Sequence, residues 1–302
     1  MDAREIGSRL RAVGCRVSEH EPLSAHTSFK IGGAADWLVT VSDCEQAAAV
    51  LRLCNSEHIP VFFLGNGSNL LVSDNGVEGV VLRIEAGENA LAVNGTQITA
   101  GAGVPLSRLC RFACENGLSG MEFAYGIPGT VGGGTYMNAG AYGGQLSNVI
   151  CAVTALTSMG ERCELSAEEL HFHYRHSVFM EQPLLVWSVT LQLQQGEPQT
   201  IHATMEQYMA CRREKQPLEY PSGGSFFKRP AGCFAGALIE QSGLKGAAVG
   251  AAQISEKHAG FLINRGGATC ADVMALCRYV QKTVQERFGV QLEREVQFIG
   301  RP

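Results

Sequence analysis

The sequence predicts a globular protein of mixed helices and strands, divided into two or three domains. Short apolar runs of strand length alternate with longer, capped segments of helical period, most regularly over the last hundred residues. A chain of 302 residues is long enough to bury a large core. A polar stretch at 194–199, QQGEPQ, marks a change in composition, and we expect a domain boundary there.

Composition and charge narrow the class of protein. Apolar residues make up 45% of the chain and charged residues 18%, which is ordinary for a globular protein. The net charge is −5 and the basic residues form no block, so nucleic acid is not expected as a main partner. No apolar run reaches the roughly 18 residues that span a bilayer. The charged, amphipathic start at 1–14 lacks the apolar region of a signal peptide. We therefore expect no membrane partner and a cytoplasmic location.

The eleven cysteines do not have the spacing of a metal site or of a disulfide framework. Their number is odd, and no CxxC pair occurs. Cys110 and Cys114 lie four residues apart on an expected helix. We expect most of the cysteines to be small buried hydrophobic residues in a reducing compartment, with neither zinc nor a set of disulfides.

The expected helices begin or end at residues that commonly cap helices. Asp43, Ser166 and Thr269 can each accept a hydrogen bond from the first turn of the helix that follows. Gly117 and Gly289 end helices because glycine readily adopts a positive φ. The expected helices span 2–14, 44–57, 105–116, 167–170, 200–214, 236–242 and 270–288.

The expected strands are short apolar or alternating runs bounded by turn residues. In the last of them, alternation places Glu293 and Glu295 on one face and Val296 and Phe298 on the other. The expected strands span 37–41, 61–64, 70–73, 80–84, 91–93, 97–100, 152–158, 161–165, 184–193, 247–254, 259–263 and 292–299.

The densest run of glycine lies at 121–144, MEFAYGIPGTVGGGTYMNAGAYGG, and its apolar residues fit neither helical nor strand period. Glycine lets a ligand approach the backbone where a Cβ would stand in the way. Pro128 predicts a stiff turn over 126–129. Thr130 is expected to cap a short helix and to leave bare N–H groups for an anion. The stretch is therefore read as a binding loop, with a plain surface loop as the alternative.

A second candidate loop, Gly65–Asn69 (GNGSN), joins two short apolar strands. Two glycines two residues apart let consecutive N–H groups point into one concavity, and Ser68 and Asn69 add side-chain donors. Such a concavity suits a pyrophosphate. The loop is neither a Rossmann fingerprint nor a Walker A loop. The alternative is a β-hairpin with an Asn-Gly turn.

Further candidates come from two polar clusters. The histidines at 171, 173 and 176 have no second cluster with ligand spacing, so we expect no metal. Arg175 lies among apolar and aromatic residues, where a guanidinium normally needs an anionic partner, either a ligand or a structural carboxylate. Ser225 lies between two glycines and two phenylalanines, next to Lys228 and Arg229; a capping serine is the alternative.

Taken together, these segments resemble the UDP-N-acetylenolpyruvoylglucosamine reductase (MurB) family of peptidoglycan synthesis. The resemblance runs nearly from end to end, with the motifs in the family's order. The motifs are HTSFKIGGAAD (26–36), LGNGSNLLV (64–72), GIPGTVGG (126–133), YMNAGAYGG (136–144), YRHSVF (174–179), GSFFKRP (224–230), AGFLIN (259–264) and LEREVQFIG (292–300). The short segment between Phe179 and Trp187 resembles the second, loop-deleted type of the family.

The resemblance implies an α+β fold with non-covalent FAD. It implies an N-terminal helix and lead-in at 1–27, an FAD-binding domain of the vanillyl-alcohol-oxidase (PCMH) type at 28–195, made of two subdomains, and an α+β substrate domain at 200–302. The implied reaction has two halves: NADPH reduces FAD, and the enolpyruvyl ether of a UDP-sugar is then reduced to UDP-N-acetylmuramate. The implied partners are thus small molecules, the UDP-sugar and NADPH.

The resemblance also implies roles for single residues. The FAD-binding residues would be Gly65, Asn66, Gly67, Ser68, Asn69, Gly126, Ile127, Pro128, Gly129, Thr130, Gly132 and Gly133. Arg175 would stabilise the negative charge that develops on the substrate, Ser225 would donate a proton, and Glu295 would orient the substrate or relay a proton. Lys215, Arg229 and His258 are further candidates for substrate contacts.

Two positions depart from the family's usual pattern: Gly134, where alanine is frequent, and Arg229, where many members have asparagine. Two other functions also fit parts of the chain. An oxidase of the same flavin fold would fit 26–144 but leaves Ser225 and Glu295 without roles. A flavin-binding regulator would bind the cofactor without turnover.

Overall fold

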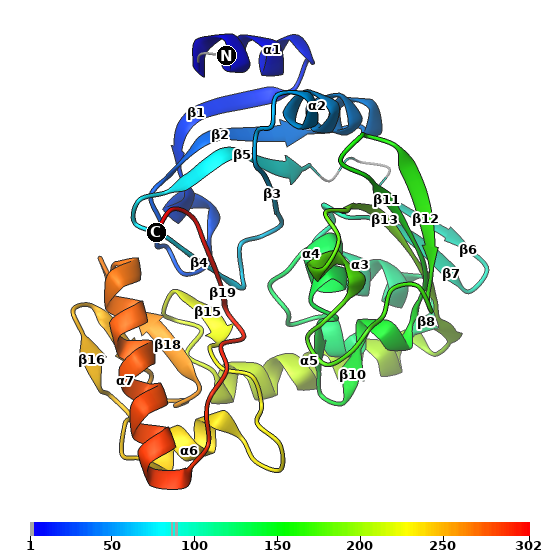
Figure 1. Cartoon of the computed structure of the whole chain (residues 1–302). Coiled ribbons are helices and arrows are strands. Elements are labelled where there is room, and N and C mark those ends of the chain that lie inside the picture. Colours follow the sequence, from blue (N-terminus) through cyan, green and yellow to red (C-terminus); the bar gives the residue numbers. More distant parts are fainter. Residues whose placement is uncertain (1–2, 86, 88–89) are drawn as a thin grey trace. The chain divides into compact units, whose positions relative to one another are not determined.

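The computed structural model describes residues 3–85, 87 and 90–302 (Figure 1). Its α-helices are α1 (Ala3–Ala12), α2 (Cys44–Ser56), α3 (Leu106–Glu115), α4 (Val131–Tyr136), α5 (Pro198–Lys215), α6 (Ala235–Gln241) and α7 (Cys270–Phe288). Short 3₁₀ turns occur at η1 (Leu23–His26), η2 (Glu122–Ala124), η3 (Leu146–Asn148) and η4 (Val178–Met180). None of the described helices is both long and apolar enough to cross a membrane.

The strands are short, and most belong to three sheets of four or five strands. They are β1 (Arg16–Pro22), β2 (Ala34–Val41), β3 (Val61–Leu64), β4 (Leu70–Val72), β5 (Val77–Ile84), β6 (Leu91–Asn94), β7 (Gln97–Gly101), β8 (Leu118–Ser119), β9 (Gly140–Ala141), β10 (Gly144–Gln145), β11 (Ile150–Leu156), β12 (Arg162–Ser166), β13 (Leu185–Gln192), β14 (Gln194–Gln195), β15 (Ser222–Ser225), β16 (Ala248–Val249), β17 (Ala252–Ile254), β18 (Phe261–Asn264) and β19 (Gln297–Ile299).

The chain forms two compact units, and neither is one continuous stretch of sequence. The first comprises Met1–Glu19, Trp37–Asn66 and Gly79–Cys211. The second comprises His20–Asp36, Gly67–Glu78 and Arg212–Pro302.

The first unit has two hydrophobic cores, each between a sheet and helices. The sheet β1-β2-β5-β3 packs against α1 and α2, where Leu10, Val50 and Val80 are fully buried. The sheet β12-β11-β13-β7-β6 packs against α3 and α4, with Leu109 and Val189 in its core.

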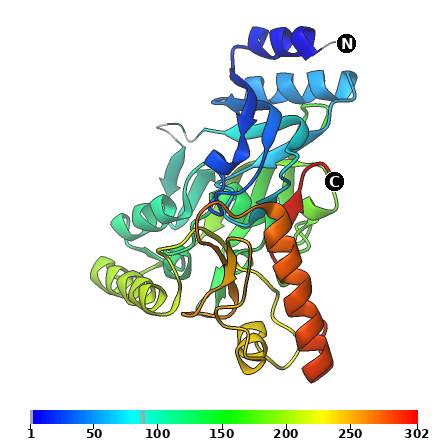
Figure 2. The same ribbon diagram turned by 90° about the vertical axis from the view of Figure 1, so that its left-hand side faces the viewer.

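The second unit is built on the antiparallel sheet β15-β18-β17-β16. Figures 1 and 2 show α7 lying along this sheet, and α7 contacts β16 and β17. Phe29 and Leu71, from far earlier in the sequence, join Phe226 and Val273 in the core of this unit. A parallel pair, β4 with β19, ties the C-terminal strand to the segment at 67–78.

The capping residues expected from the sequence at α2 and α7 are confirmed. Asp43 accepts a hydrogen bond from the Gln46 N–H at 2.8 Å and starts α2. Thr269 and Asp272 form a capping box at the start of α7, and Gly289 ends it with φ of 67°. Residue 2, the expected start of the first helix, lies outside the described residues.

Three expected elements are wrong. Residues 167–170 form a turn instead of a helix, because the Ser166 N–H donates to Glu169 Oε2 at 2.8 Å while Ser166 stays in β12. The expected strand at 247–254 is a hairpin, β16–β17, since Gly250 turns the chain with φ of 54°. The expected strand at 292–299 is regular only in β19, and Val296 is buried whereas Phe298 is 39% exposed. Two-residue alternation therefore does not hold there.

The composition shift at 194–199 precedes the change of compact unit. Gln194 and Gln195 form β14, which pairs with β8 of the first unit. Ile201 and Met205 of α5 are buried in a core of that unit. The change of unit therefore falls within α5, after Cys211.

Candidate functional site

The GNGSN loop is not a hairpin turn. β3, which precedes it, pairs in parallel with β5, and β4, which follows it, pairs in parallel with β19. The two strands that flank the loop belong to different sheets, so the hairpin alternative is wrong. The loop instead carries the chain from the first unit, which ends a segment at Asn66, to the second, which resumes at Gly67.

This loop has the unpaired backbone donors that an anion requires. Within the described residues, the N–H groups of 65–68 donate no hydrogen bond to the protein. Gly67 adopts φ of 59°, and a Cβ there would lie 2.3 Å from the His26 carbonyl oxygen. Only glycine fits both the conformation and the space. The Asn69 side chain differs from the expectation, because Nδ2 donates to the Glu295 carbonyl oxygen at 3.1 Å.

Within the first unit, the start of this loop meets the glycine-rich loop. A Cβ on Gly65 would lie 2.7 Å from Thr130 Oγ1. Asn66 Nδ2 donates to the Pro128 carbonyl oxygen at 3.4 Å. Two segments singled out separately from the sequence thus lie together.

Thr130 caps α4 as expected, but the N–H groups at the start of that helix are not bare. Thr130 Oγ1 accepts from the Gly133 N–H at 3.2 Å. The Val131 and Gly132 N–H groups donate to the carbonyl oxygens of Val104 and Ala102, both at 2.8 Å. The expectation of free donors on the helix is therefore wrong. Within the described residues, the backbone N–H groups of Gly129 and Thr130, just before the helix, donate no hydrogen bond to the protein.

Arg175 occupies a tight turn of the first unit. His173 and His176 exchange backbone hydrogen bonds, both 3.2 Å, across the turn. Arg175 is the third residue of this turn and has φ of 55°, a conformation that favours glycine. Its guanidinium donates to the Gly140 carbonyl oxygen at 3.1 Å and lies 5.4 Å from the centre of the Tyr174 ring. Arg175 is one of seven non-glycine residues with a positive φ in the described part of the chain.

In the second unit, two segments about seventy residues apart bring Ser225 and Glu295 into neighbouring positions. The Glu295 N–H donates to the Phe226 carbonyl oxygen at 2.9 Å, and the Lys228 N–H donates to the Glu293 carbonyl oxygen at 2.8 Å. Ser225 is exposed and Glu295 half-buried. A hydroxyl and a carboxyl thus lie on adjacent backbone segments of one unit, whereas Arg175 belongs to the other unit.

The three candidate cations of the second unit have different surroundings. Lys228 Nζ lies 3.4 Å from Glu293 Oε2 in a partly exposed ion pair. The guanidinium of Arg229 lies 4.4 Å from the centre of the exposed Phe234 ring. Lys215 is exposed at the end of α5.

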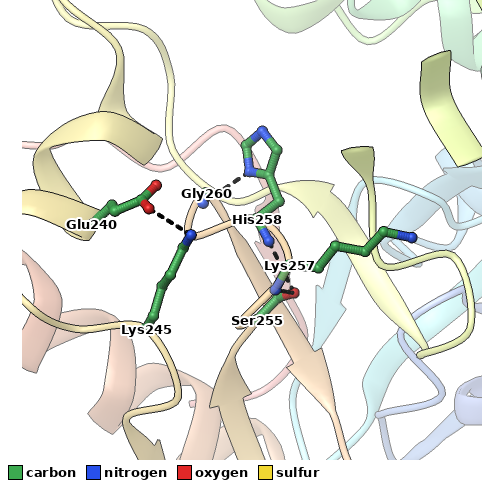
Figure 3. Close-up of polar contacts among 6 residues, drawn as sticks. All are labelled: Glu240, Lys245, Ser255, Lys257, His258 and Gly260. Carbon is green, nitrogen blue, oxygen red and sulfur yellow. Dashed lines mark hydrogen bonds and ion pairs between the residues drawn. The ribbon is translucent and has the colours of Figure 1, made fainter. Parts of the chain in front are cut away.

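His258 lies in a turn of the second unit that is rich in polar contacts (Figure 3). The Gly260 N–H donates to His258 Nδ1 at 3.1 Å, and Ser255 Oγ accepts from the backbone of residues 257 and 258. Burial lowers the pKa of His258 from its ordinary value, and Lys245 lowers it further. Lys245 Nζ itself pairs with Glu240 at 2.6 Å. The imidazole is therefore held neutral, with Nδ1 as an acceptor.

Within the described residues, no group of three or more histidine, cysteine or acidic side chains is arranged to hold a metal ion. All eleven cysteines are free thiols, five of them buried and six partly buried. Fewer are fully buried than expected. Burial raises the pKa of Cys54 to about 12.

Sequence reasoning missed two residues of the glycine-rich loop that have a positive φ. Asn138 is 2% exposed with φ of 42°, and Tyr142 is 44% exposed with φ of 51°. The Tyr142 ring stacks on Tyr208 with centres 4.3 Å apart, and its hydroxyl donates to the Tyr208 carbonyl oxygen at 2.9 Å. Only their position within the glycine-rich loop pointed to these residues.

Two family models match the chain. Residues 35–166 match an FAD binding domain, and residues 216–299 match the C-terminal domain of UDP-N-acetylenolpyruvoylglucosamine reductase. Reductases of that name from Listeria monocytogenes and Lachnoclostridium phytofermentans are 49% and 47% identical to this chain. Each alignment covers 94% of this chain, and 95% and 93% of the respective relative. The chain belongs to the UDP-N-acetylenolpyruvoylglucosamine reductase family.

The fold agrees with this assignment. The crystal structure of the family's reductase (MurB) from Thermus caldophilus has a TM-score of 0.81 to this chain at 37% identity, covering 94% of this chain and 99% of the other. The expected α+β architecture, an FAD-binding domain followed by the C-terminal domain of this reductase family, is confirmed.

Proposed function

We propose that this flavoenzyme reduces the enolpyruvyl group of UDP-N-acetylenolpyruvoylglucosamine to UDP-N-acetylmuramate for peptidoglycan synthesis, with FAD as cofactor and NADPH as hydride donor. The observation that carries the proposal is the match to named reductases over nearly the whole chain, both domains included. A match to the FAD domain alone would fit an oxidase or a flavin-binding regulator equally well.

The residues that would hold FAD fit an anionic, extended ligand. The unpaired N–H groups of 65–68 offer a cluster of donors to the pyrophosphate, and Gly67 keeps the concavity free of a side chain. Gly129 and Thr130 add donors from the loop 126–133. We assign Gly126, Ile127, Pro128, Gly132 and Gly133 to the neighbouring parts of the cofactor. We propose that the cofactor is bound non-covalently, as the family resemblance implies.

Bound FAD supplies hydride transfer between NADPH and the substrate. Hydride added to the enolpyruvyl C3 leaves negative charge at C2 and on the carboxylate. The fixed guanidinium of Arg175 stabilises that charge, because its turn and the Gly140 carbonyl hold it in place before the reaction begins. The guanidinium therefore needs little reorganisation as charge develops.

Ser225 donates the proton to C2, and Glu295 orients the substrate carboxylate or relays a proton. A serine hydroxyl is a weak acid, so the alkoxide that it leaves must be stabilised by neighbouring charge. Lys228 follows Ser225 by three residues, and its Nζ is partly exposed. The backbone pairing of 226–228 with 293–295 keeps Glu295 and Ser225 on adjacent segments.

Lys215, Arg229 and His258 are proposed as additional substrate contacts, to the diphosphate or to the nicotinamide. The first two are exposed cations that can meet phosphate. His258, held neutral, would act as a hydrogen-bond donor through Nε2.

We propose that residues 28–195 bind FAD and that residues 200–302 bind the substrate. The N-terminal helix and the segment that leads into the FAD-binding domain span 1–27. We place the reaction in the cytoplasm, where eleven unpaired thiols suit the reducing conditions. Its product would serve cell wall formation and hence cell shape and division.

The deciding experiment follows flavin absorbance in the absence of oxygen. NADPH should bleach the yellow protein, and the enolpyruvyl UDP-sugar should then restore the colour with formation of UDP-N-acetylmuramate. Rapid recovery with air alone, and none with the UDP-sugar, would favour an oxidase. A yellow protein that NADPH never bleaches would favour a regulator.

A further inference from the structure

Arg175 is held in an unusual backbone conformation by a residue that has no part in the reaction assigned above. The turn at 173–176 places an arginine where turns of this shape favour glycine. Such a conformation persists only when surrounding contacts over-determine it. The contacts that hold the turn should therefore be visible in the first unit.

Asn138 makes the central contact. Its Nδ2 donates to the His173 carbonyl oxygen at 3.0 Å, the same oxygen that accepts from the His176 N–H across the turn. Its Oδ1 accepts from the Ser147 N–H at 3.0 Å. The buried amide of Asn138 thus makes two hydrogen bonds, one to the turn at 173–176 and one to Ser147 in η3.

Two further hydrogen bonds join the same two segments. Ser177 Oγ, fully buried, donates to the Tyr136 carbonyl oxygen at 2.7 Å, and Arg175 donates to the Gly140 carbonyl oxygen. Asn138 lies between these two acceptors in the sequence. Three hydrogen bonds therefore hold the turn at 173–176 and the adjoining Ser177 to the loop 136–147.

Asn138 also has a left-handed backbone of its own, with φ of 42°. Asparagine tolerates this conformation better than most residues. An alanine or leucine would neither accept the conformation readily nor supply the donor and the acceptor. Asparagine therefore suits position 138 for two reasons: it tolerates the positive φ, and its side chain supplies both a donor and an acceptor.

We propose that Asn138 is a positioning residue for Arg175, fixing the turn so that the guanidinium meets the charge that develops on the substrate. The inference rests on the proposed function for the choice of half-reaction. Asn138 should matter for oxidation of the reduced flavin by substrate and should not matter for reduction of FAD by NADPH.

Two substitutions of Asn138 separate the role of its side-chain hydrogen bonds from the role of its backbone conformation. Asn138→Gly removes the amide while glycine still accepts the positive φ. Asn138→Asp keeps the volume and the acceptor for Ser147 but replaces the donor to His173. Asn148 provides the matched control, because it directly follows the loop 136–147, is exposed, and within the described residues its side chain accepts a local hydrogen bond, from the Gln145 N–H at 3.0 Å. The same two changes are made there.

The first measurement is amide hydrogen exchange over 171–181, which does not depend on catalysis. Exchange of the His176 amide should speed at least ~10-fold in both Asn138 variants and stay unchanged in both Asn148 variants. Unchanged exchange in the Asn138 variants would refute the inference, whatever reaction the enzyme catalyses. Because the aspartate side chain has nearly the same size as that of asparagine, exchange in Asn138→Asp decides the matter even if Asn138→Gly does not fold.

The second measurement is stopped-flow absorbance of each half-reaction. Asn138→Asp should leave reduction by NADPH within about twofold and slow oxidation by the UDP-sugar at least ~10-fold, the scale of a small misplacement of a catalytic group. In an Arg175→Met background, Asn138→Asp should have no additional effect. An equal effect in both backgrounds, or a normal second half-reaction, would overturn the positioning role. A wild-type enzyme that does not react with the UDP-sugar contradicts the proposed function, and the exchange result still decides whether Asn138 holds the turn.

Discussion

Asn69 and Glu295 are joined by a hydrogen bond from the Asn69 side-chain amide to the Glu295 carbonyl oxygen, at 3.1 Å across 226 residues of sequence. The Gln297 N–H returns a bond to the Asn69 carbonyl oxygen at 3.0 Å, and β4 pairs with β19. The loop proposed to bind the pyrophosphate is thus tied directly to the backbone of a proposed catalytic residue. A substitution that displaces the loop 65–69 should therefore also displace the backbone at Glu295.

Gly67→Val should abolish FAD retention. A valine there would meet the His26 carbonyl and would also be strained at φ of 59°. Gly95→Val is the control, because Gly95 has the same φ of 59° but no atom within 4 Å of an added Cβ. Flavin content per protein, measured after purification, should fall for the first variant only. Full FAD content in Gly67→Val would show that the loop 65–69 does not bind the cofactor.

Ser225→Ala should separate the two half-reactions. Reduction of FAD by NADPH needs no proton from Ser225 and should keep its rate, whereas oxidation by the substrate should slow at least ~10²-fold. Ser222→Ala, in the same strand, serves as the control, because within the described residues the Ser222 hydroxyl makes one hydrogen bond, from the Gly224 N–H at 3.4 Å. Were Ser225 only a cap, both halves would stay normal and stability would fall by about 1 kcal/mol. Equal slowing of both halves would indicate a defect in binding or folding.

All of the flavin should leave the protein on denaturation, because the family resemblance implies non-covalent FAD. Acid denaturation followed by filtration should pass the yellow colour entirely into the filtrate. Colour retained with the protein would contradict this expectation and would call for a search for the attached residue by mass spectrometry.

His258 should titrate below its ordinary pKa of about 6.5. Burial is the main cause, and protonation would also break the bond from the Gly260 N–H to Nδ1. Because the folded state binds the proton less readily than the unfolded state, this group makes stability fall as the pH drops through 6.5 towards the folded pKa. His258→Gln should therefore reduce the loss of Tm between pH 7 and pH 5. An NMR titration of the His258 ring with a midpoint at or above 6.5 would contradict the prediction.

Buried thiols should resist alkylation in the native enzyme. Burial raises the pKa of Cys54 to about 12 and those of Cys270 and Cys277 to about 11. At pH 8 the thiolate fraction of Cys54 is then on the order of one in ten thousand, and the thiolate is the reactive form. Mass spectrometry after iodoacetamide treatment should show Cys233, which is only partly buried, labelled well before these three. Equal labelling in the native protein would show that the cores open readily.

Local elements were predictable because their signals are local. The caps Asp43 and Thr269 and the end at Gly289 depend on residues within one turn, and the structure has them as predicted. The turn at 167–170 is harder to predict, because the hydrogen bond from the Ser166 N–H to Glu169 is just as local as a helix cap and competes with it. The sequence motifs also identify the family and its cofactor, because eight motifs in a fixed order rarely occur together in an unrelated protein.

Tertiary structure alone decided which segments meet and which donors stay unpaired. Nothing near Thr130 in the sequence indicates that Val104 and Ala102 would occupy the first N–H groups of α4. Nothing near Asn138 indicates that its amide would reach His173, 35 residues away. Parallel pairing of β4 with β19 likewise requires a partner more than 200 residues distant. Such contacts depend on the closure of long stretches of chain, which packing of the whole protein determines and short-range sequence patterns do not encode.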